Sequence, residues 1–89
     1  TSGTTLSLAG FTKSGSSKAI LSFVSDRDAS ATPAPPAPFA AVRGPGTSTV
    51  FTANLAAITS AGLYSNGTNV VWTGFGNTYE QTGFLLELT

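Results

Sequence analysis

The segment Lys18-Ala19-Ile20-Leu21-Ser22-Phe23-Val24-Ser25 decides the fold class of this 89-residue chain. Successive side chains of an extended strand point to opposite faces, so the segment divides into two rows. The rows are Ala19, Leu21 and Phe23 on one face and Ile20, Ser22 and Val24 on the other. Both rows are apolar enough to be buried, which predicts a strand in the middle of a sheet.

The same alternation recurs along the rest of the chain, between turns rich in Gly, Ser and Asn. Gly15-Ser16-Ser17 and Gly44-Pro45-Gly46 are expected turns. Further alternating segments are Thr5–Leu8, Phe39–Arg43, Thr47–Asn54, Leu63–Ser65, Thr68–Trp72 and Thr82–Leu88. The pattern predicts one all-β domain over residues 1–89, a small antiparallel β-sandwich or barrel of six to seven strands with a long Pro-rich loop.

Two local patterns refine this expectation. Asn66-Gly67 predicts a type I′ hairpin between Leu63–Ser65 and Thr68–Trp72, because both residues tolerate positive φ. Leu55, Ile58 and Ala61 have helical spacing before Gly62, which allows one short helical turn.

The last alternating segment is apolar on both faces except at Glu87. The pattern places Phe84, Leu86 and Leu88 on the core side and Leu85 and Glu87 opposite. We therefore expect Leu85 to be covered by a second sheet, a symmetry mate or a donated strand.

Residues 26–38 break the β pattern, because their prolines remove backbone donors and favour polyproline II. The segment is predicted to be a loop or stiff arm that contacts a neighbouring subunit or particle surface, and the alternative is a strap within the domain. The residues assigned to this interface arm are Pro33, Pro35, Pro36, Pro38 and Phe39. Pro33-x-x-Pro36 and Pro35-x-x-Pro38 also have the spacing of peptide-recognition ligands, but no basic residue stands close enough to orient them.

Charge is scarce: four basic and four acidic residues give a net charge of zero, and charged residues make up only 9% of the chain. Without a basic stripe, nucleic acid is not expected as a partner. Soluble monomers usually keep more surface charge, so the composition favours a subunit that contacts its own copies or a larger particle. A secreted domain with an ordinary Ser/Thr-rich surface is the alternative.

The chain lacks Cys, His and Met, which suits a protein outside the cytosol and leaves no usual zinc or iron ligands. No apolar run approaches the ~18 residues of a membrane helix, so no membrane span is expected. The chain begins with Thr1 and shows no charged leader before an apolar stretch, so we expect any signal segment to have been removed.

Catalytic chemistry is not expected, since no His or Cys is present and a small domain has little room to oppose two carboxylates across a cleft. Asp26 and Asp28 flank Arg27; pairing with Arg27 is favoured over a Ca²⁺ site, which needs six to eight oxygens. Asn66-Gly67-Thr68 fits a glycosylation sequence, but a turn explains the same residues. No cofactor is predicted.

An aromatic cluster near the expected hairpin is the one candidate ligand site. Tyr64, Trp72 and Tyr79 are possible glycan-stacking residues, with amides of Asn69, Asn77 and Gln81 as hydrogen-bonding groups. The alternative, favoured for Trp72 and Phe75, is that the large rings fill the core.

Together these patterns predict a non-enzymatic structural or accessory subunit of an extracellular assembly, such as a viral capsid decoration (cement) protein or a filament subunit. The expected partners are proteins, through self-association or a larger particle, and the expected location is extracellular or the virion surface. The alternative is a carbohydrate-binding module that uses surface aromatics.

Overall fold

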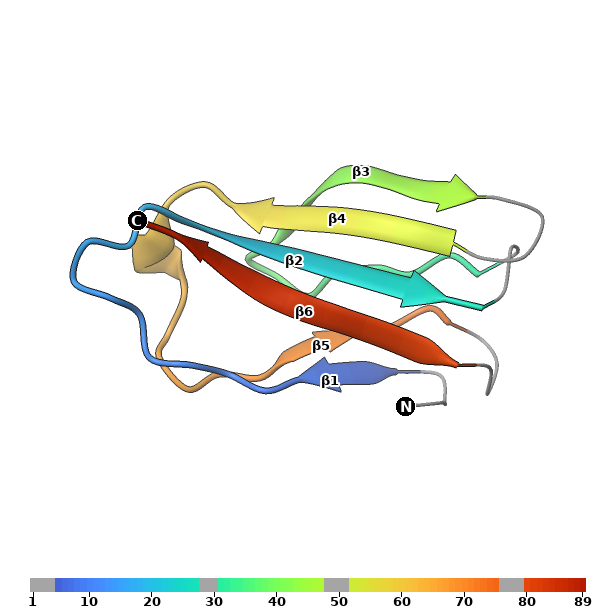
Figure 1. Ribbon diagram of the computed structural model, residues 1–89, viewed down its shortest axis with the longest axis horizontal. Coiled ribbons are helices and arrows are strands. Elements are labelled where there is room, and N and C mark those ends of the chain that lie inside the picture. Colours follow the sequence, from blue (N-terminus) through green and yellow to red (C-terminus); the bar gives the residue numbers. More distant parts are fainter. Residues whose placement is uncertain (1–4, 28–30, 48–51, 76–79) are drawn as a thin grey trace.

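The computed structural model describes residues 5–27, 31–47, 52–75 and 80–89, and within them the chain forms six strands in two antiparallel sheets. The elements are β1 (Leu6–Leu8), β2 (Ala19–Asp26), β3 (Ala40–Thr47), β4 (Thr52–Ile58), the 3₁₀ turn η1 (Ala61–Leu63), β5 (Val70–Trp72) and β6 (Gln81–Leu88). Figure 1 shows the long strands β2, β4 and β6 side by side. The all-β prediction is confirmed.

The larger sheet has the order β3-β4-β2-β6, so β2 is a central strand, as its sequence predicts. Its row Ile20, Ser22, Val24 and Asp26 is buried, whereas the opposite row is half-buried. β4 pairs with β2 from Ile20↔Ile58 to Asp26↔Thr52.

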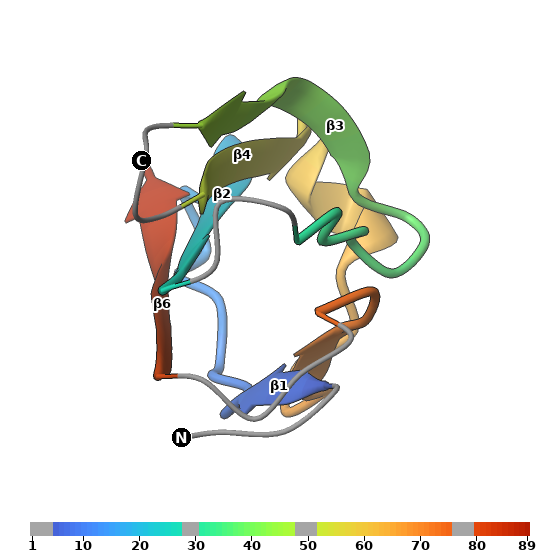
Figure 2. The same cartoon turned by 90° about the vertical axis from the view of Figure 1, so that its right-hand side faces the viewer.

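The smaller sheet is the pair β1-β5, with Ser7 opposite Val71. Figure 2 shows this pair across the interior from β3 and β4, with β1 next to one end of β6. β1 and β6 belong to different sheets, so the described strands do not close into the barrel that the sequence allowed.

The core fills the space between the two sheets. Its buried apolar side chains come from both: Leu6, Leu8, Val70 and Trp72 on one side and Ile20, Val24, Ala56 and Ile58 on the other, with Phe39, Tyr64 and Phe75. The indole Nε1 of Trp72 donates a hydrogen bond of 2.8 Å to the Ser22 hydroxyl, which connects the sheets inside the core. One end of the interior is polar, since Asp26, Thr52, Asn54 and Gln81 are buried there.

The turn predicted at Gly44-Pro45-Gly46 is wrong. These residues lie within β3, where the pairing with β4 shifts register between Ala41 and Arg43 and again between Arg43 and Gly46. An edge strand with such irregularities accepts Gly and Pro that a regular ladder would exclude. The single strand predicted over Thr47–Asn54 is therefore also wrong: β3 ends at Thr47 and β4 begins at Thr52, with residues 48–51 outside the described ones.

The predicted Asn66-Gly67 hairpin is wrong as well, although the turn exists. The Thr68 amide donates to the Ser65 carbonyl at 3.1 Å, and Gly67 has φ of +81°. Asn66 does not have positive φ, and β5 pairs with β1 rather than with Leu63–Ser65, so this is not a type I′ turn.

The helical pattern over 55–62 was misplaced. Leu55 and Ile58 lie in β4, because the strand is held between two neighbours in the sheet, and the 3₁₀ turn takes up only Ala61–Leu63.

Candidate interaction surface

The four-stranded sheet has one face turned away from the core, and the pairing register defines its members. Phe23 stands opposite both Leu55 of β4 and Phe84 of β6, so these three side chains share that face. We call this surface the outer face. Its residues on the three long strands are Ala19, Leu21, Phe23 and Ser25, then Ala53, Leu55 and Ala57, and finally Thr82, Phe84, Leu86 and Leu88.

The outer face is apolar and carries no charged side chain among these residues. Its most exposed members are on β6: Phe84, Leu86 and Leu88 are 54%, 47% and 42% exposed. The rings of Phe23 and Phe84 stack with centroids 5.3 Å apart. Single exposed apolar residues are ordinary on protein surfaces, whereas contiguous apolar patches are typical of interaction sites. Here three exposed apolar residues follow one another on alternate positions of β6, next to the half-buried Leu21 and Phe23 of β2.

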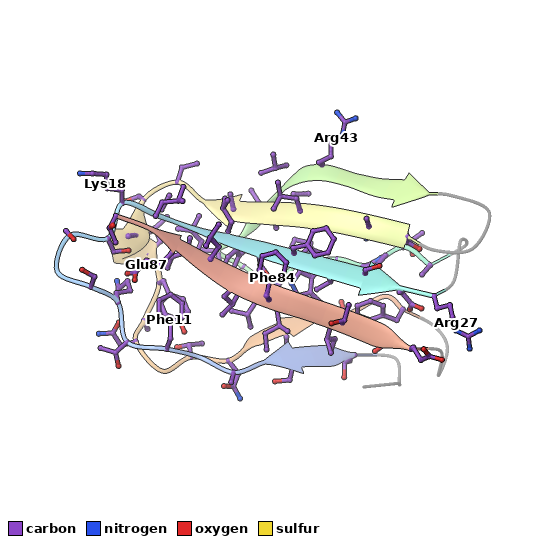
Figure 3. All side chains as sticks on the ribbon, viewed as in Figure 1. Phe11, Lys18, Arg27, Arg43, Phe84 and Glu87 are labelled. Atoms are coloured by element: carbon purple, nitrogen blue, oxygen red, sulfur yellow. The ribbon has the colours of Figure 1, made fainter. Side chains whose placement is uncertain are left out.

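Charged side chains stand around the edge of this surface. Lys18 precedes β2, Arg27 follows it, and Arg43 is on the edge strand β3, in register with Leu55. Figure 3 shows these three side chains at the periphery and Phe84 about halfway along β6, the other edge strand of the sheet. An apolar centre with a polar rim is the usual anatomy of a protein–protein interface.

The sequence pattern assigned the faces of the last strand the wrong way round. Phe84, Leu86 and Leu88 were expected in the core, but they are exposed on the outer face. Leu85 and Glu87 face inward instead: Leu85 packs against the core, and the Glu87 carboxylate accepts a hydrogen bond of 2.8 Å from the Ser14 amide.

Close packing between the sheets explains this reversal. A Cβ built on Gly83 would lie 2.6 Å from the Phe23 carbonyl oxygen and 3.3 Å from Leu8 of β1. Only a residue without a side chain fits at this inward position, and once Gly83 faces inward, Phe84 must face outward.

Two of the three aromatic residues predicted to stack on a glycan are buried. Trp72 is 1% exposed and its indole nitrogen is bonded to Ser22 in the core. Tyr64 is 4% exposed, stacks on Phe11 with centroids 5.1 Å apart, and donates its hydroxyl hydrogen to the Thr68 carbonyl at 2.6 Å. Surface stacking is therefore wrong for Tyr64, and for Trp72 the favoured alternative, a ring that fills the core, is confirmed.

The remaining members of that cluster do not form a described binding site. Phe75 and Gln81 are buried, and the Asn69 side-chain oxygen accepts a hydrogen bond of 3.0 Å from the Gly10 amide. Tyr79 and Asn77 lie outside the described residues.

The proline-rich segment packs against its own chain where it is described. Ala34 and Thr73 exchange two backbone hydrogen bonds of 2.8 and 3.0 Å, and Ala31, Pro33 and Phe39 are buried. The predicted arm is therefore wrong for this part, which forms the alternative, a strap within the domain. Pro35 and Pro36 are half-buried and Pro38 is exposed, so only these prolines stay available to a partner.

The acidic residues do not assemble a described metal site. Asp26 is buried, Asp28 lies outside the described residues, and Arg27 forms an exposed ion pair with Glu80 at 3.3 Å. In the described ranges, no group of three or more acidic side chains is placed to hold a metal ion. Those ranges also hold no helix long and apolar enough to cross a membrane.

Comparison with protein-family models, with curated proteins and with solved structures yields no match for this chain.

Proposed function

We propose that this protein is a non-enzymatic structural or accessory subunit of an extracellular assembly, such as a capsid decoration protein or a filament subunit. The observation that carries the proposal is the uncharged outer face, on which Phe84, Leu86 and Leu88 are exposed side by side on alternate positions of one strand. The proposal includes that the two sheets act as the layers of a small sandwich, with the opposite face of the larger sheet left for a partner.

Hydrophobic burial supports this role. Full burial of a Leu or Phe side chain contributes about 1.5–3 kcal/mol relative to full exposure. Covering the exposed half of Phe84, Leu86 or Leu88 therefore contributes about 1 kcal/mol for each side chain. A chain with only four basic and four acidic residues also has little long-range repulsion to keep copies or partners apart.

The proposal also includes an extracellular location or the surface of a virion. A surface dominated by Ser and Thr, with no Cys, Met or His to oxidise or bind metal, suits the outside of a cell or of a virion. The partners are other proteins, either further copies or the surface of a larger particle.

Carbohydrate binding has less support, because Trp72 and Tyr64, two of the three residues predicted to stack on a glycan, are buried. It remains the outcome that a failed test would favour.

Thermal melts across an about hundredfold dilution, paired with the mass from light scattering, test the proposal. An assembling subunit melts at a lower temperature when diluted and has a mass above the monomer, since association stabilises the fold by mass action. A monomer mass with a midpoint that does not move would overturn the proposal, and binding on a glycan array would then establish the alternative.

A further inference from the structure

The structure points to the occupant of the outer face. We propose that this surface binds the same surface of a second copy of the chain, with the Phe23–Phe84 stack at the centre of the contact. The inference rests on the proposed assembly role and adds which surface and which partner it uses.

Electrostatics favour a second copy as the partner. A two-fold dimer places the same patch on both sides, so any charge within it would meet a like charge close to the axis. The outer face has no charged residue on β2, β4 or β6, and the whole chain has a net charge of zero. Self-association through these three strands therefore meets no like-charge repulsion, and the charged Arg43 lies on β3, at the edge of the sheet opposite to β6.

The size of the surface matches what a specific dimer needs. Four strands about 4.8 Å apart, each about 25 Å long, cover roughly 480 Å² per copy, or about 1,000 Å² for two copies. That figure reaches the lower bound of about 1,000 Å² for a specific interface, before the relief of the side chains is added. The contact is large enough for a dimer only if most of the sheet takes part.

The distribution of large side chains sets the alignment of the two copies. The exposed apolar residues of the outer face are on β6, next to Leu21 and Phe23 of β2, and at the opposite edge β3 contributes Arg43 and the exposed Val42. Laying β6 and β2 of one copy over β6 and β2 of the other buries these residues together. An alignment that instead lays β6 of one copy over β3 of the other would place the exposed residues of β6 against Arg43.

Strand addition at the β3 edge is a poorer route to association. This strand contains Pro45, which has no N–H to donate, and its ladder with β4 is interrupted by two register shifts. Irregular edges of this kind resist pairing with another strand. The face of the sheet, rather than its β3 edge, is thus the better contact.

Leu86→Lys tests this contact, with Leu63→Lys as its matched control. Leu86 is 47% exposed on the outer face, whereas Leu63 is 60% exposed on η1 and is not part of a strand of the sheet. A lysine buried at a dimer contact without a partner is strongly unfavourable, so Leu86→Lys should raise the dimer dissociation constant at least about tenfold. Leu63→Lys should change it by less than about twofold. Sedimentation velocity over a concentration series measures both.

A milder variant keeps the test valid if the lysine variant fails to fold. Leu86→Thr introduces a β-branched residue, which suits a strand, and replaces an apolar side chain by a smaller one with a hydroxyl, so it should also weaken the dimer, by several-fold. Circular dichroism of each variant checks that the strands are retained.

Each result has a distinct meaning. Wild-type association that survives Leu86→Lys and Leu86→Thr in folded protein overturns this inference but leaves the assembly role standing, through another surface. A wild-type chain that stays monomeric at every concentration overturns both. Dimers lost in both Leu86 variants and kept in Leu63→Lys are the expected result.

Discussion

At the scale of single residues, the Ser22 hydroxyl makes a polar contact inside the core that connects the two sheets. It accepts the hydrogen bond from the Trp72 indole, and both residues are fully buried. Ser22→Ala leaves that N–H without a partner, so we expect a loss of about 1–3 kcal/mol in the free energy of unfolding, measured by urea denaturation. Ser25→Ala, which lies three residues further along β2 and on the outer face, serves as the control. Equal losses in the two variants would contradict the role of the bond.

Gly67 is a second residue whose identity matters by itself. Its φ of +81° lies in the left-handed region, yet nothing stands within 4 Å of a Cβ placed there. Gly67→Ala therefore isolates backbone strain and should reduce the free energy of unfolding by about 1 kcal/mol. Gly15→Ala, also open to solvent but without positive φ, should be neutral or slightly stabilising. The turn assignment fails if both variants have the same thermal midpoint.

At the scale of elements, the strap over residues 31–39 depends on Gly74. A Cβ at this position would lie 2.4 Å from the Thr32 carbonyl oxygen, and Gly74 also has φ of +87°. Gly74→Ala should push the strap away from the end of β5 and destabilise the protein by at least about 2 kcal/mol.

Hydrogen exchange gives the specific readout for this variant. The amides of Ala34 and Thr73, which donate to each other's residue, should exchange faster in Gly74→Ala than in the parent. Gly62→Ala, where no atom stands within 4 Å of the added Cβ, should leave both rates unchanged. Protection of Ala34 and Thr73 that is the same in all three proteins would show that the strap does not depend on this contact.

At the scale of the whole molecule, the proposed dimer should respond to salts as an apolar contact does. The charged residues stand at the perimeter of the outer face, and the Arg27–Glu80 ion pair is exposed to solvent. We expect sodium chloride between low and physiological strength to change the dissociation constant by less than about threefold, because screening acts on charges that the contact lacks. Ammonium sulfate should tighten the dimer, since it strengthens apolar burial. Dissociation by moderate sodium chloride would instead indicate a contact made through rim charges.

The local pattern was sufficient for some strands, but not for the bounds of all of them or for their relative placement. Alternation at Ala19–Ser25 predicted the central strand β2, because apolar residues on both faces are typical of a strand inside a sheet. The strand does have a neighbour on each edge, although its outer row is only half-buried. The same logic failed at Gly44-Pro45-Gly46, where an edge strand absorbs the irregularity, and at Leu55 and Ile58, where two flanking strands override helical spacing.

The sequence pattern could not predict the outer face as an exposed surface, for a related reason. Period-two spacing divides Thr82–Leu88 into two faces but does not say which is inside when both carry leucine. The close approach of β2 and β1 to Gly83 requires this glycine to face inward, and both strands are far from Gly83 in the sequence. In the same way, the rings of Tyr64 and Trp72 are apolar bodies with a polar atom, and only the positions of Thr68 and Ser22 show that the polar atom is satisfied inside.

By itself, then, the sequence determined the all-β class, the central strand and the scarcity of charge, since each follows from spacing or composition along the chain. The tertiary structure alone decided that the proline segment is largely a strap and that Phe84, Leu86 and Leu88 face outward. These outcomes depend on contacts between segments distant in the sequence, and a one-residue change of register exchanges the buried and exposed faces of a strand.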